Sequence, residues 1–120
     1  MGIRSDVALG MTKEVYNALT EQSKQTIGEW FDGQHTNEEG DILFTAESVK
    51  WYVQSYAELS ALVDDLNEQD YEQFILICAT SEYPNSEEYD MGDWHDNPWQ
   101  LYKYVSCEIR CDGRNVLTFS

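Results

Sequence analysis

The sequence predicts one α+β domain, a sandwich in which a mostly antiparallel sheet carries two main helices on one face. The length of 120 residues suits a single domain, which we expect to span residues 1–120. A hydrophobic content of 42%, with 13% aromatic residues, is sufficient for a core despite the high charge. Segments with strand and helix periodicity follow in the order β, α, β, α, β, β, which makes a ferredoxin-like arrangement a candidate.

The first strand and helix are marked by alternation and by capping residues. Residues 3–11 alternate between apolar and other side chains, which predicts a half-buried strand. Thr12 can cap a helix, and Thr20 or Ser23 can restart that helix before Gly33 ends it.

The next segment is a polar connection followed by a second alternating stretch. Residues 34–40 are expected to form a turn-like loop that includes His35. Residues 42–53 alternate, which predicts one long strand or a tight hairpin broken near Glu47 and Ser48.

A second helix and a buried strand follow. Ser55 and Glu58 form an S-x-x-E capping box ahead of apolar residues at helical spacing, namely Leu59, Leu62, Val63 and Leu66. Residues 71–79 are nearly all apolar, which predicts a central strand covered on both faces.

The last third contains a long loop and a final pair of strands. Residues 81–99 are rich in acids and aromatics and contain both prolines, and loops of this length in compact domains are often functional. Alternation from 101 to 111 predicts a strand, and Asp112 and Gly113 would turn residues 116–119 back as an edge strand.

Cysteine usage and hydropathy indicate a reduced, cytoplasmic protein without a membrane span. The chain lacks the run of about 18 apolar residues that a transmembrane helix needs, and its start lacks the order of a signal peptide. Three cysteines without a C-x-x-C pair favour core-filling thiols over a disulfide framework or a metal site.

The negative charge is concentrated in the middle of the chain. Residues 51–102 hold twelve acidic residues and no Lys or Arg, and the chain has a net charge of -16. This charge argues against direct contact with nucleic acid or an anionic membrane and favours a basic partner. The alternative interpretation is that the acids serve solubility alone.

A negative surface can also imitate a nucleic acid. A domain of this length has a diameter of about 35 Å, over which a DNA duplex carries on the order of 20 phosphates. The net charge of -16 is comparable to the charge of such a duplex. Mimicry also requires the carboxylates to share one surface, and a solvated helix face beside a polar loop is the alternative.

The acids of the long loop are mixed with aromatic rings, as in a protein interface. We therefore predict a partner-binding set in this loop: Glu82, Glu87, Glu88, Tyr89, Asp90, Asp93, Trp94 and Asp96. The alternative for the rings, among them Tyr83 and Trp99, is that they pack the loop onto the sheet.

The sequence contains no catalytic signature, so we expect a non-enzymatic protein without a cofactor. It has no G-x-S-x-G, no glycine-rich phosphate loop and no H-E-x-x-H, and His35 and His95 are its two histidines. Asp90, Asp93, His95 and Asp96 could surround a divalent ion, but their spacing is not that of an EF-hand, and we expect no metal.

Two short segments resemble a group of small uncharacterised bacteriophage proteins. These are Met1-Gly2-Ile3-Arg4-Ser5-Asp6-Val7 and Glu47-Ser48-Val49-Lys50-Trp51-Tyr52, the latter followed by an acidic helix and a strand. The resemblance implies a phage accessory role and a compact α/β fold, and it supplies no active-site residue.

These observations lead to one hypothesis with two alternatives. The hypothesis is a phage-type inhibitor of a basic, nucleic-acid-handling host protein, such as a restriction or CRISPR component. The first alternative is a small-ligand or nucleotide-binding module using Arg4, Lys50 and Arg110. The second is a homo-oligomeric structural protein with the aromatics as its self-interface, although like charges would oppose its assembly.

Overall fold

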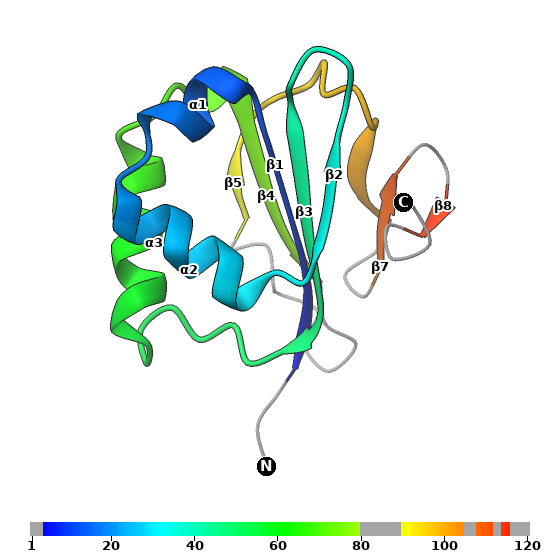
Figure 1. Cartoon of the computed structure of the whole chain (residues 1–120). Coiled ribbons are helices and arrows are strands. Elements are labelled where there is room, and N and C mark those ends of the chain that lie inside the picture. The colour runs from blue at the N-terminus through cyan, green and yellow to red at the C-terminus, as the bar shows by residue number, and fades with distance from the viewer. Residues whose placement is uncertain (1–3, 80–89, 105–107, 112–113, 116–120) are drawn as a thin grey trace.

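The computed structural model describes residues 4–79, 90–104, 108–111 and 114–115, which form three layers (Figure 1). Two helices, α2 and α3, cover one face of a five-stranded sheet, and a small three-stranded sheet packs on its other side. The elements are, in order, β1 (Ser5–Met11), α1 (Lys13–Ala18), α2 (Glu21–Trp30), β2 (Gly33–Thr36), β3 (Ile42–Val49), α3 (Ala57–Asn67), the 3₁₀ helix η1 (Tyr71–Gln73), β4 (Phe74–Ala79), β5 (Met91–Gly92), β6 (Leu101–Tyr104), β7 (Glu108–Cys111) and β8 (Arg114–Asn115).

The strand order confirms the predicted fold class. The main sheet runs β2-β3-β1-β4-β5, and each neighbouring pair is antiparallel. Its first four strands, with α1/α2 after β1 and α3 after β3, have the split β-α-β order of the ferredoxin-like arrangement. The second sheet, β6-β7-β8, is a layer that the sequence pattern did not predict.

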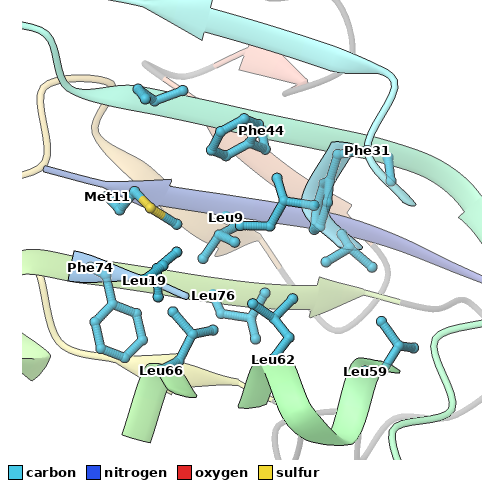
Figure 2. Close-up of a cluster of buried hydrophobic side chains, with 14 of the residues drawn as sticks. Leu9, Met11, Leu19, Phe31, Phe44, Leu59, Leu62, Leu66, Phe74 and Leu76 are labelled. Atoms are coloured by element: carbon cyan, nitrogen blue, oxygen red, sulfur yellow. The ribbon is translucent and has the colours of Figure 1, made fainter. Parts of the chain in front are cut away.

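The main core lies between the sheet and the helices (Figure 2). Alternate residues of the central strand β1, such as Leu9 and Met11, point toward the helices, as expected for a strand of period two. From α3, residues at helical spacing meet them: Leu59, Leu62 and Leu66, each 0% exposed. The prediction is therefore confirmed for the three leucines, whereas Val63, the fourth residue of the predicted pattern, is only half-buried.

Capping explains where the first two helices begin. The Thr12 hydroxyl accepts a hydrogen bond from the Val15 N–H at 3.2 Å, and the Thr20 hydroxyl accepts one from the Ser23 N–H at 3.1 Å. The predicted cap at Thr12 is confirmed, and of the two alternatives for the second helix the cap is Thr20 and not Ser23. The capping box predicted at Ser55 is wrong, because α3 begins after Tyr56, which makes no side-chain cap.

Three predicted boundaries also differ from the structure. Helix α2 ends at Trp30, and Gly33 begins strand β2, so residues 34–36 pair with β3 rather than forming a loop. Strand β3 ends at Val49, just after Ser48 takes a positive φ of 55°, so the alternation through residue 53 does not continue the strand.

The stretch predicted as one strand from 101 to 111 is instead the two antiparallel strands β6 and β7. The returning strand described after β7 is β8, Arg114–Asn115, whereas the predicted turn at 112–113 and edge strand at 116–119 lie outside the described residues. Period-two alternation does not mark where a chain reverses, because it continues across a hairpin.

A second core lies between the main sheet and the small sheet. The two tryptophans of the long loop, Trp94 and Trp99, pack edge to face with ring centroids 5.8 Å apart. Trp99 also closely approaches β1, because a Cβ added at Gly10 would lie 3.2 Å from its ring. Ile77 and Ala79 of β4 join this core, whereas Phe74 and Leu76 face the helices. The prediction that this strand is covered on both faces is confirmed.

Candidate acidic interface

A groove with a volume of about 480 Å³ lies beside β4, between β5 and the start of β6. Its apolar lining includes Ile75 and Ile77 of β4 and Leu101 of β6. Its polar and aromatic lining includes Asp90, Asp93, His95 and Tyr102. The lining contains no Lys or Arg among the described residues, so the charge at this groove is negative.

The chain around β5 is held against β4 and η1 by a glycine and by two hydrogen bonds. Gly92 has a φ of 84°, and a Cβ there would lie 2.2 Å from the Phe74 carbonyl oxygen, so the site admits only glycine without rearrangement. The Cys78 N–H donates to Asp90 Oδ1 at 2.9 Å, and the Asp93 N–H donates to the Tyr71 carbonyl at 2.7 Å. These contacts fix one wall of the groove.

The loop between β5 and β6 is shaped by Asn97, which is 5% exposed. Its Oδ1 accepts a hydrogen bond from the Leu101 N–H at 2.6 Å, and its Nδ2 donates to the Trp94 carbonyl at 3.0 Å. A buried amide that satisfies backbone groups in this way stiffens the loop. Asn97 therefore positions the opposite wall of the groove.

The chain from the end of α3 to η1 carries three exposed carboxylates, and the residue after β5 carries a fourth. We call this set the acidic edge: Glu68, Asp70, Glu72 and Asp93. All four are exposed, and the hydrogen bond from Asp93 to Tyr71 joins the β5 end of this surface to η1. Tyr71 lies among them and is 41% exposed, with its hydroxyl donating to Asn67 Oδ1. The acidic edge thus combines carboxylates with an exposed phenol.

The predicted partner-binding residues lie in different settings. Glu82, Glu87, Glu88 and Tyr89 fall outside the described residues. Asp93 and Asp96 are exposed, whereas Asp90 is half-buried because its carboxylate binds the backbone of β4. Trp94 is 8% exposed, because its indole packs into the second core against Trp99. Of the two alternatives for this ring, packing the loop onto the sheet is the one observed.

The sequence did not single out the two rings that are exposed here. Tyr71 and Tyr102 are 41% and 43% exposed and are the large hydrophobic side chains that the described surface presents. The position of Tyr71 between Asp70 and Glu72 could have indicated that its ring is exposed, but Tyr71 also begins an apolar run, which suggested the interior of a strand. The signal at Tyr102 is its alternation with the buried Leu101.

The four residues considered as possible metal ligands do not form a metal site within the described residues. Asp93 Oδ1 lies 2.9 Å from His95 Nε2, with both side chains largely exposed. Within the described part of the chain, no group of three His, Cys, Asp or Glu side chains is arranged to hold a metal ion. The described pair is thus a surface contact.

The residues of the alternative ligand site are distributed over two sheets. Arg4 donates from Nη1 to the Ser48 carbonyl at 3.0 Å, and Lys50 follows the Val49 that pairs with Ser5, so these two lie at one end of the main sheet. Arg110 belongs to β7 of the small sheet. None of the three lines the groove.

The fold and this surface define a small acidic α+β domain whose described residues carry an acid-rich groove. Comparisons with protein-family models, with curated proteins and with solved structures found no match. None of the helices in the described residues has the length and apolarity to cross a membrane.

Proposed function

We propose that this protein is a non-enzymatic inhibitor that binds the basic groove of a nucleic-acid-handling protein. The observation that carries the proposal is the acidic edge, whose Asp93 also lines the groove together with Asp90 and the exposed Tyr102, with no Lys or Arg in the lining described. Aromatic rings are the usual anchors of interfaces, and carboxylates beside them pair with Arg and Lys of a partner.

The scale of the charge also supports imitation of a nucleic acid. The longest dimension of the domain is 37 Å, over which a DNA duplex carries on the order of 20 charges. The net charge of -16 is of that order. A partner that binds DNA through Lys and Arg would find a comparable number of negative charges here, and the field would accelerate its approach.

The biological setting that we propose is a bacteriophage accessory protein acting in the cytoplasm of the host cell. The support is the resemblance of the segments at residues 1–7 and 47–52 to small phage proteins. Host restriction and CRISPR components bind nucleic acid through basic surfaces, which makes them the class of target that this charge pattern fits.

The proposal is tested by capture from host lysate with two matched variants. The first variant reverses two charges of the acidic edge, Glu72→Lys and Asp93→Lys. The second reverses two exposed charges elsewhere, Glu29→Lys on α2 and Glu47→Lys at the end of β3 remote from η1. Both variants change the net charge equally, so a difference between them reports the position of the charge.

We expect the wild type and the control variant to retain one basic nucleic-acid-binding protein that the acidic-edge variant does not retain. Duplex DNA should displace that protein, because the two ligands would occupy the same basic surface. The proposal would be contradicted if both variants retained the basic protein equally. It would also be contradicted if salt displaced that protein but duplex DNA did not.

A further inference from the structure

We infer that the groove between β5 and β6 is a subsite for an arginine side chain of the partner. The inference rests on the proposed function and names the chemical group that the groove would take. Three features of the groove carry it: an apolar lining, carboxylates and an exposed phenol ring. An arginine side chain has a matching apolar stem and a planar, charged head.

The apolar part of the groove suits the methylene stem of arginine. Ile75 is half-buried and lies on the face of β4 that packs against the second core, and the buried Leu101 of β6 also belongs to the lining. Long cationic side chains commonly lay their methylene groups along such apolar surface while the charged head stays at a polar rim.

The charged head would meet the carboxylate of Asp93. This side chain is 62% exposed, and His95 Nε2 is its contact at 2.9 Å. His95 is itself 84% exposed, so it can swing away into solvent when a guanidinium arrives. A guanidinium binds a carboxylate through two parallel N–H bonds, which an imidazole cannot do.

The exposed ring of Tyr102 distinguishes arginine from lysine. Tyr102 lines the groove and is 43% exposed, so its ring is available to a ligand. A guanidinium stacks on an aromatic face through its planar group, whereas an ammonium is a compact and strongly hydrated charge. The combination of carboxylate and phenol therefore favours arginine.

The test is a titration of the full-length protein with three short peptides, followed by NMR of its backbone amides. The peptides are acetyl-Gly-Arg-Gly-amide, its citrulline analogue and its lysine analogue. Citrulline has the shape of arginine without the charge, so it separates charge recognition from stem packing. We expect amide shifts at Asp93, His95 and Tyr102 with the arginine peptide, and binding weaker by roughly fivefold with either analogue.

Three variants locate the site. Tyr102→Ala and Asp93→Asn should each weaken arginine binding by about two- to fivefold, since each removes one contact of a partly exposed pair. Glu47→Gln, at the far end of β3, should leave it unchanged. All three positions are exposed, and the amide spectrum of each variant reports whether the fold is retained.

The assignment of the groove to arginine would be overturned if the citrulline or the lysine peptide bound as tightly as the arginine peptide. It would also be overturned if the arginine peptide caused the same amide shifts in both groove variants, Tyr102→Ala and Asp93→Asn. If the peptides fail while the basic partner is still captured, the arginine subsite is wrong and the proposed function stands. If the arginine peptide binds in the groove but no basic protein is captured, the subsite stands and the proposed function is wrong.

Discussion

Asp65 of α3 binds the first turn of α2 through Ser23, whose hydroxyl donates to Asp65 Oδ2 at 2.7 Å. The same oxygen accepts hydrogen bonds from the N–H of Thr20 at 2.9 Å and from its hydroxyl at 3.1 Å. Thr20 is also the N-cap of α2. One carboxylate therefore holds the N-cap residue of α2 in place and joins the two helices that cover the sheet.

We predict that Asp65→Ala lowers the free energy of unfolding by about 1–2 kcal/mol, because it removes a charged acceptor from the start of α2. The matched control is Asp64→Ala, since Asp64 is exposed and makes no hydrogen bond within the described residues. Urea denaturation of both variants checks this. Equal losses would contradict the capping role, because both changes raise helix propensity alike.

The stability should also depend on pH through Asp65. Partial burial raises the pKa of this carboxyl, but the hydrogen bonds from Thr20, Ser23 and Gln69 outweigh burial and hold the pKa below its usual 3.8. Because the pKa of Asp65 is lower in the folded chain than in the unfolded chain, the unfolded chain binds a proton first as the pH falls. The stabilisation from this carboxylate is therefore present above the unfolded-state pKa and is lost as the pH falls through the folded-state pKa.

The measurement is the difference in unfolding free energy between the wild type and Asp65→Asn as a function of pH. We expect the difference to grow as the pH rises through the acid range and to level off above about pH 5. A difference that stays constant from acid to neutral pH would show that the charge of Asp65 does not stabilise the fold.

Gly92→Ala should destabilise the protein by about 2–4 kcal/mol, because a Cβ would strain a left-handed backbone and collide with a carbonyl. Gly92 has a φ of 84°, and a Cβ built on it would lie 2.2 Å from the carbonyl oxygen of Phe74. Gly28→Ala is the contrasting change, since nothing lies within 4 Å of its Cβ. In the helix interior it should stabilise by about 0.5–1 kcal/mol. Thermal unfolding of both variants tests whether β5 is fixed as described.

Asn97→Ala should cost about 1–3 kcal/mol, because it leaves the Leu101 N–H and the Trp94 carbonyl without their buried partner. The exposed Asn17 of α1 provides the control, for which Asn17→Ala should be within about 0.5 kcal/mol of the wild type. Chemical denaturation measures both. A loss of the same size at Asn17 would mean that the amide of Asn97 does not hold the loop.

The sequence predicted the elements whose signal is local. The caps at Thr12 and Thr20 and the leucines of α3 depend on neighbours within one or two turns, so spacing alone identified them. The strand β2 was missed because its residues are polar and its pairing with β3 is made by backbone groups.

The candidate site was only partly predictable. Asp93 was chosen from the composition of its loop, but its place beside η1 depends on the hydrogen bond to Tyr71, which lies 22 positions earlier. Trp94 was chosen for its acidic neighbours, yet the second sheet gives its ring a buried place beside Trp99. Composition indicated the chemistry of the surface, whereas the long-range pairing of strands decided which side chains reach it.

The most direct test of the proposed interface is the association rate constant of the captured basic protein, measured at low and at high salt. For Glu72→Lys with Asp93→Lys we predict a rate at low salt about tenfold below that of the wild type, and a smaller difference at high salt. The control, Glu29→Lys with Glu47→Lys, should stay within about twofold of the wild type. Equal rates for the two double variants at low salt would contradict binding through the acidic edge.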